Sequence, residues 1–184
     1  MNLPNVITLV RIVMIPAFVL IYMQYSAWSY AVAAGLFTVA AATDWLDGYL
    51  ARRLNQTTPF GAFLDPVADK LIVVSALVIL IAHHHSLWLT LPGLIIIGRE
   101  IVISALREWM AEMNESVAVV VSQLGKVKTM LQMIAIIVLL ASPPDFSLMW
   151  VQTGYLLIYV ASLLTLWSMW QYLRAAWPSL KRGL

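Results

Sequence analysis

The sequence Asp44-Trp45-Leu46-Asp47-Gly48-Tyr49-Leu50-Ala51-Arg52 is followed, after eight residues, by Gly61-Ala62-Phe63-Leu64-Asp65-Pro66-Val67-Ala68-Asp69. These two stretches place four carboxylates in segments that otherwise have the composition of membrane-spanning helices. A charged side chain in the hydrocarbon core costs about 2.5–3.5 kcal/mol on insertion scales. Four carboxylates with few basic neighbours therefore need a compensating ligand, and a divalent metal ion is the obvious one.

The composition identifies an integral membrane protein. The chain has 184 residues, of which 62% are hydrophobic and only 11% are charged, whereas soluble domains average about 25% charged residues. Apolar stretches occupy nearly the whole length, so we expect a single polytopic domain over residues 1–184. Cysteine is absent, which excludes disulfides and thiolate metal sites.

A helix needs about 20 apolar residues to cross the hydrocarbon core. The segments that meet this requirement are 5–24, 30–50, 61–83, 88–107, 124–142 and 151–173. We therefore predict an all-α bundle of six transmembrane helices.

All lysines and arginines fall on one side of the membrane in this six-span arrangement. They are Arg11, Arg52, Arg53, Lys70, Arg99, Arg107, Lys126, Lys128, Arg174, Lys181 and Arg182. The positive-inside rule then predicts that both termini are cytoplasmic. Trp28, Trp88 and Trp150 would mark the outer interface, as residues of an aromatic belt.

The four carboxylates are spaced for convergence. Asp44 and Asp47 are three residues apart, and Asp65 and Asp69 are four apart, so each pair shares one helix face. The two helices are neighbours in the chain, and we expect both pairs to point to one site near the cytoplasmic surface. Mg²⁺ prefers oxygen ligands, and two ions about 4 Å apart would clamp a diphosphate.

The alternative is that these carboxylates form buried ion pairs with Arg52, Arg53 or Lys70. It is disfavoured because it leaves acids unneutralised at a depth where charge is costly. Pro66 is expected in the first turn of its helix, where a missing N–H is tolerated.

The spacing Asp-x2-Asp-Gly-x2-Ala-Arg-x8-Gly-x3-Asp-x3-Asp, from Asp44 to Asp69, resembles the signature of the CDP-alcohol phosphatidyltransferases. The resemblance extends from the opening at Asn5–Arg11 to the sixth span. Residues 61–70 and 99–109 are most similar to the bacterial members whose acceptor is glycerol 3-phosphate. The resemblance implies that family's fold, a homodimer, and a location in the bacterial inner membrane with the active site at the cytoplasmic face.

It also implies a reaction, in which the phosphatidyl group of CDP-diacylglycerol passes to glycerol 3-phosphate and CMP is released. The motif aspartates would hold two Mg²⁺ or Mn²⁺ ions, and Asp69 would also act as general base. The residues implied to contact the CDP-lipid are Asn5, Gly48, Arg52 and Gly61.

A glycerol phosphate acceptor brings a second phosphate, which needs cations of its own. Arg107, Lys126 and Lys128 flank one cytoplasmic loop and are the best candidates, with Thr8 and Arg11 next. Arginine suits bidentate phosphate binding, and lysine supplies a point charge. The alternative is that these basic residues set the topology or contact anionic lipid head groups.

Other polar groups are interpreted differently. Arg99 lies deeper in the membrane and is predicted to be a structural or substrate-orienting residue rather than a topology signal. Arg99 and Glu100 are adjacent and are not expected to face each other on a helix. The histidines at 83–85 are predicted to form a polar loop at the outer interface, and the basic residues at 174–182 to determine topology.

Two alternatives concern function. The signature handles the shared CDP-lipid, so the residues alone leave serine, inositol phosphate or phosphatidylglycerol open as the acceptor. A divalent-cation transporter would need polar residues near the midplane and a path to the outer side. The outer halves of the predicted spans are almost purely apolar, which favours an interfacial enzyme. The expected partners are the lipid bilayer, the two substrates and a second copy of the chain, with no nucleic acid.

Overall fold

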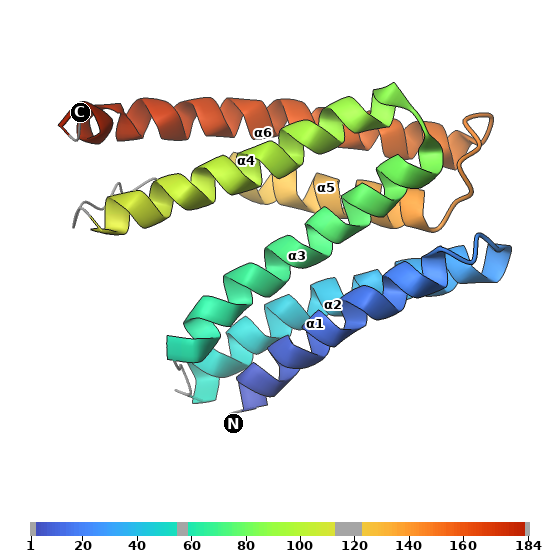
Figure 1. Ribbon diagram of the computed structural model, residues 1–184, viewed down its shortest axis with the longest axis horizontal. Helices are drawn as coiled ribbons and strands as arrows, with labels where there is room; N and C mark the ends of the chain where they lie inside the picture. The colour runs from blue at the N-terminus through green and yellow to red at the C-terminus, as the bar shows by residue number, and fades with distance from the viewer. Residues whose placement is uncertain (1–2, 55–58, 113–122, 183–184) are drawn as a thin grey trace. The chain divides into compact units, whose positions relative to one another are not determined.

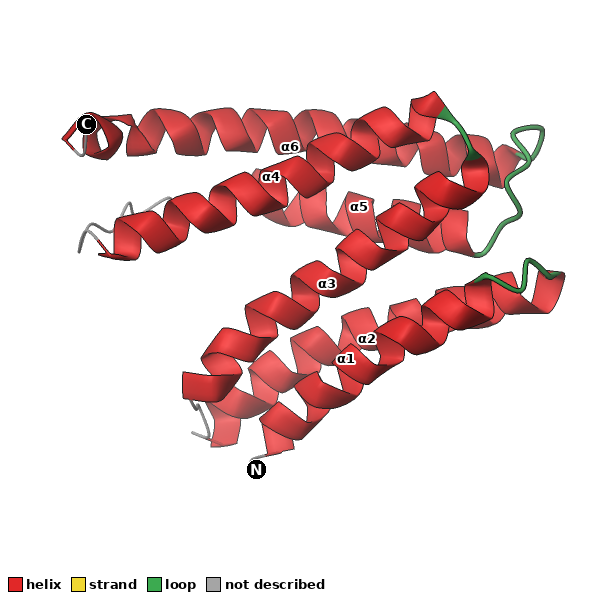
Figure 2. Cartoon of the chain, viewed as in Figure 1, coloured by secondary structure: helices red, strands yellow, loops and turns green. Residues whose placement is uncertain are grey.

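The computed structural model describes residues 3–54, 59–112 and 123–182. Within these ranges the chain forms six helices and no strand (Figures 1 and 2). Their bounds are α1 Leu3–Tyr22, α2 Ala27–Leu54, α3 Pro59–His84, α4 Leu87–Glu112, α5 Gln123–Leu140 and α6 Met149–Arg182. Each predicted span overlaps one of these helices, so the prediction of an all-α chain is confirmed.

Three helices are long and apolar enough to cross a membrane, judged on the described residues alone. Their apolar stretches are Asn5–Tyr22, Leu87–Ala111 and Met149–Pro178, and α2 adds a shorter one at Ala27–Thr43. Large apolar side chains on α1 are exposed, including Val13 and Leu20 at 69% and 66%. Such exposure suits lipid contact, and the chain is a membrane protein.

The chain divides into two compact units. Unit 1 comprises Met1–His85 and Ile136–Gln152, and unit 2 comprises Ser86–Ala135 and Thr153–Leu184. In unit 1, α1 packs against α2 and α3, and α2 packs against α3. Phe18 on α1 and Phe37 on α2 meet edge to face, with ring centroids 6.0 Å apart, and both are fully buried.

Aromatic residues cover His83 at the far end of α3. The Tyr30 hydroxyl lies 2.9 Å from His83 Nε2, and the Tyr25 ring stacks on His83 with centroids 4.1 Å apart. The prediction of a polar loop at 83–85 is wrong for its first two residues, because His83 and His84 form the last turn of α3. His85 ends the helix with a φ of 47°.

Unit 2 is built around a buried stripe on α4. Leu89, Ile96, Ile103 and Met110 recur every seven residues and are at most 2% exposed. A seven-residue repeat keeps one helix face against its neighbours along the whole length of the helix. The same helix carries Arg99, Glu100 and Arg107, and the stripe therefore fixes their position.

Candidate active site

Helix α2 carries the first half of the acidic motif. Because α2 continues to Leu54, Asp44, Asp47 and Gly48 lie on one regular helix, as their spacing requires, and Arg52 follows about one turn after Gly48. The side chains of residues 44–54 lie outside the described residues. Their convergence with α3 stays a prediction.

Helix α3 carries the second half. Gly61 is buried, Asp65 is half-buried and Asp69 is exposed. The two aspartates lie about one turn apart, so they occupy one face of α3. Asp69 has a polar or electrostatic partner in the structure.

Helix α1 reaches the acidic site through Thr8. The Thr8 hydroxyl donates a hydrogen bond of 2.7 Å to Oδ1 of Asp65, and Thr8 is fully buried. The sequence predicts Thr8 as a ligand of the acceptor phosphate, and the structure adds this contact with a carboxylate of the acidic motif. Thr8 fixes the orientation of Asp65.

Thr8 belongs to a buried polar stripe on α1. Asn5, Thr8 and Arg11 follow at intervals of three residues and are 7%, 0% and 1% exposed. All three make polar or electrostatic interactions within the structure. A buried arginine requires such partners, because an unpaired charge in the interior is costly. The stripe therefore faces the interior of unit 1, the unit that also holds Asp65 and Asp69.

Pro66 lies deeper in α3 than predicted. The helix begins at Pro59, so Pro66 is beyond the first turn, and the prediction of a first-turn position is wrong. Proline has no N–H to donate to the carbonyl four residues earlier. One backbone hydrogen bond of α3 is therefore missing immediately beside Asp65.

We predict that Thr8→Val destabilises the protein while Thr8→Ser does not. A hydrogen bond to a charged group contributes about 1.5–3 kcal/mol, and valine removes it at nearly constant size. Unfolding in detergent micelles would measure the difference. Thr38→Val is the matched control, because the Thr38 hydroxyl donates only to the Ala34 carbonyl of its own helix. Equal losses in the two valine variants would contradict this role for Thr8.

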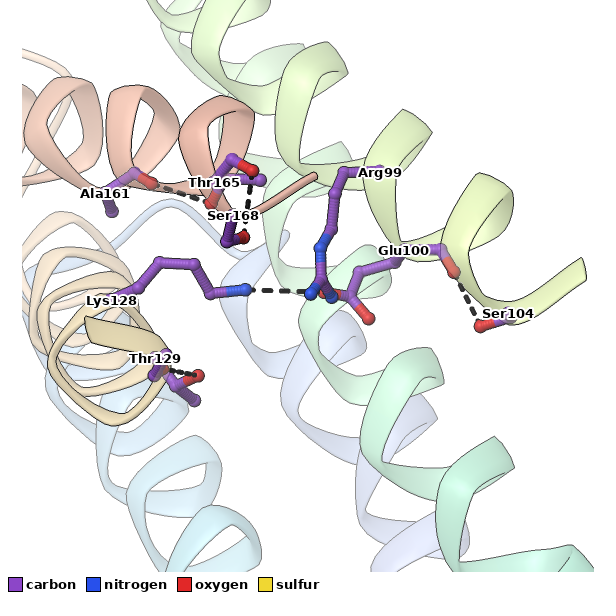
Figure 3. A network of polar contacts seen from close by, with 9 residues as sticks. Arg99, Glu100, Ser104, Lys128, Thr129, Ala161, Thr165 and Ser168 are labelled. Carbon is purple, nitrogen blue, oxygen red and sulfur yellow. Dashed lines mark hydrogen bonds and ion pairs between the residues drawn. The ribbon is translucent and has the colours of Figure 1, made fainter. Parts of the chain in front are cut away.

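A second polar cluster lies in unit 2 (Figure 3). Arg99 Nη1 lies 2.8 Å from Oε1 of Glu100, and Lys128 Nζ on α5 lies 3.8 Å from the same oxygen. The expectation that Arg99 and Glu100 do not meet is wrong, because the long arginine side chain curls back to its neighbour. Two cations thus share one carboxylate, and the group carries a net positive charge.

The other two predicted phosphate ligands of unit 2 are exposed. Arg107 lies on α4 with its guanidinium carbon 5.5 Å from the ring centroid of Tyr172, and Lys126 lies on α5. Lys128 is only 5% exposed, so of the two lysines it is the one that faces the interior. The sequence indicates a structural or substrate-orienting role for Arg99, because charges deep in a membrane span are rare and commonly functional. The structure adds its contact with Glu100.

The carboxylates fit a hard divalent cation by their chemistry. No group of three or more histidine, cysteine, aspartate or glutamate side chains is placed to hold a metal ion within the described residues. Of the four motif aspartates, only Asp65 and Asp69 have side chains that the structure describes. Asp44, Asp47, Asp65 and Asp69 remain the residues that would hold the metal.

Comparison with known proteins adds a full-length match. The model of a family described as CDP-alcohol phosphatidyltransferase matches residues 1–170. The chain is 58% identical to the CDP-diacylglycerol–glycerol-3-phosphate 3-phosphatidyltransferase of Pseudomonas fluorescens, over 98% of this chain and 93% of the relative. It is 54% identical to the protein of the same name from Escherichia coli K12, over 95% and 94% of the two chains.

Proposed function

Because the chain belongs to the CDP-alcohol phosphatidyltransferase family, we propose that it transfers the phosphatidyl group of CDP-diacylglycerol to glycerol 3-phosphate. The products are phosphatidylglycerophosphate and CMP. The observation that carries this proposal is the identity of 54–58% to relatives whose names state that reaction. The same identity disfavours serine, inositol phosphate and phosphatidylglycerol as acceptors, and it disfavours a cation transporter.

The proposed reaction forms one bond from oxygen to phosphorus and breaks another. A hydroxyl oxygen of glycerol 3-phosphate attacks the phosphorus that carries the diacylglycerol, and the bond from that phosphorus to the CMP oxygen breaks. Asp69 takes the proton of the attacking hydroxyl, since a carboxylate within reach can act as general base. Thr8 holds Asp65 in place beside it.

Four aspartates, Asp44, Asp47, Asp65 and Asp69, would hold two Mg²⁺ or Mn²⁺ ions. When bound, such ions neutralise charge on the diphosphate and stabilise the leaving oxygen. The requirement for oxygen ligands and the placement of two carboxylates on one face of α3 support this proposal.

Two sets of residues are proposed for the substrate contacts. The residues proposed to contact the CDP-lipid are Asn5, Gly48, Arg52 and Gly61, on α1, α2 and α3. Those proposed for the acceptor phosphate are Thr8, Arg11, Arg107, Lys126 and Lys128. The positive charge around Glu100 supports an anionic ligand in unit 2.

We further propose that all six helices span the bacterial inner membrane, with both termini and the active site at the cytoplasmic face. The distribution of lysine and arginine supports this topology. The homodimer remains a proposal from the family resemblance.

We predict that Arg107→Ala raises the KM for glycerol 3-phosphate tenfold or more, with a smaller change in the KM for CDP-diacylglycerol. The loss of charge-assisted hydrogen bonds to a phosphate costs about 1.5–3 kcal/mol. The KM of Arg107→Lys for glycerol 3-phosphate should lie between those of wild type and Arg107→Ala, because lysine keeps the charge and loses the bidentate geometry. Steady-state kinetics in mixed micelles would measure both constants. An unchanged KM for glycerol 3-phosphate would assign the acceptor phosphate to other residues.

The test of the function is a panel of acceptors. The purified protein would receive CDP-diacylglycerol with glycerol 3-phosphate, serine, inositol phosphate or phosphatidylglycerol, and CMP release and the lipid product would be measured. We expect CMP release with glycerol 3-phosphate and formation of phosphatidylglycerophosphate. Release with another acceptor alone would keep the family and overturn the proposed reaction.

A further inference from the structure

Helix α6 is longer than the membrane requires. It has 34 residues, which gives a length of about 51 Å, whereas the hydrocarbon core is about 30 Å thick. Trp150 and Trp170 are exposed at 69% and 62%, and their separation along the helix is about 30 Å. Tryptophan concentrates at both membrane interfaces, so these two residues fit opposite edges of the core. The last turns of α6, after Trp170, then lie at head-group level and beyond.

Tryptophan and basic residues alternate along one face of these last turns. The residues of this α6 face are Trp170, Arg174, Trp177 and Lys181, at helical spacings of four, three and four. Trp170 and Trp177 are more than half exposed, whereas Tyr172 and Ala176 on the opposite side are buried. The helix therefore packs within unit 2 through one side and leaves the α6 face open.

The α6 face is hollowed by a groove of about 440 Å³. Trp170, Leu173, Arg174 and Trp177 line it, so its walls are apolar and its one charged residue is a guanidinium. Lys181 places its Nζ 5.7 Å from the ring centroid of Trp177. Apolar walls beside a cation suit an amphiphilic ligand with a hydrocarbon chain and an anionic head group.

The charge of the α6 face is not offset within its own helix. Helix α6 contains no aspartate or glutamate. Among the residues that the structure describes, no carboxylate forms an ion pair with Arg174 or Lys181. Basic residues next to a transmembrane helix attract anionic lipids. The positive charge of the α6 face and its position at the level of the lipid head groups therefore both favour an anionic lipid as its ligand.

We propose that the α6 face binds an anionic phospholipid of the surrounding bilayer. The lipid phosphate lies against Arg174 and Lys181, and the apolar part of the lipid next to the head group lies in the groove beside Trp170. This site goes beyond the topological role that the basic residues at 174–182 have from sequence alone. It is independent of the proposed reaction, because none of its residues belongs to the catalytic or substrate-binding set.

The test is lipid retention measured by native mass spectrometry. The intact protein would be titrated with phosphatidylserine or with phosphatidylcholine of the same acyl chains, neither of which is a substrate of the proposed reaction. We expect wild type to retain one phosphatidylserine more tightly than phosphatidylcholine. Arg174→Gln with Lys181→Gln should weaken phosphatidylserine binding about 25-fold, at about fivefold per cation. Arg174→Lys with Lys181→Arg is the matched control and should retain it.

Three results would overturn the proposal. The first is equal retention of the two lipids by wild type, and the second is undiminished phosphatidylserine binding by the double glutamine variant. The third is a dimer that holds no lipid and dissociates when Trp170 and Trp177 are replaced by alanine, which would show that a second copy of the chain covers the face. Circular dichroism of each variant would verify that α6 and the other helices are intact.

Discussion

Replacement of Asp69 by asparagine is expected to reduce the turnover number by two to four orders of magnitude. A positioned general base contributes about that factor, and the amide cannot take the proton of the acceptor hydroxyl. Asp69 is exposed on α3, so the nearly isosteric change should leave the fold intact. CMP release in mixed micelles would measure turnover, and thermal unfolding would verify the fold.

Asp145 provides the matched control for this substitution. It lies in the exposed connection between α5 and α6, where hydrogen bonds from the side chain and the backbone of Ser147 lower its pKa. Asp145→Asn makes the same chemical change away from the acidic motif, and we expect turnover close to wild type. Normal turnover in Asp69→Asn would remove the general-base role. Equal losses in the two variants would show that the effect is not specific to the motif.

Replacement of Glu100 by alanine is expected to destabilise the protein by about 3 kcal/mol. The Arg99 and Lys128 side chains are only 16% and 7% exposed, and both lie within 4 Å of the Glu100 carboxylate. Removing one partner from a buried charge cluster leaves the other charges uncompensated, which typically costs 3–5 kcal/mol. Chemical unfolding in micelles would measure the difference.

Glu108→Ala is the control, because Glu108 lies on the same helix with an exposed side chain. We expect Glu108→Ala to change stability by less than about 1 kcal/mol, as exposed ion pairs contribute little. A second variant, Glu100→Ala with Arg99→Met, should recover part of the stability by removing one uncompensated cation. A Glu100→Ala protein as stable as the Glu108→Ala protein would show that the cluster is not a buried charge network.

The helices could be predicted because the signal for each is local. An apolar run of about 20 residues is readable without knowledge of what it packs against, and all six predicted spans overlap helices. The predicted end of α3 at residue 83 is within one residue of the observed end at His84, where tyrosines from α1, α2 and the turn between them surround the His83 ring. The predicted ends of α4 and α6 at residues 107 and 173 are less accurate, because both helices continue beyond the apolar run, to Glu112 and Arg182.

The acidic motif was readable because its chemistry is unusual in a membrane and its spacing matches a helix. The side-chain contacts found in the structure could not be predicted from the sequence. The bond from Thr8 to Asp65 joins residues 57 positions apart, and the pairing of Arg99 with Glu100 depends on side-chain conformation rather than on helical periodicity. Contacts of both kinds are decided by tertiary packing, which one sequence without its fold does not specify.

The most direct test of the account is the metal dependence of CMP release. The purified protein would be treated with EDTA, freed of the chelator, and assayed with CDP-diacylglycerol and glycerol 3-phosphate before and after addition of Mg²⁺ or Mn²⁺. We predict that CMP release falls to background after EDTA and returns with either ion. Full activity in the presence of excess EDTA would contradict a metal site formed by the four aspartates.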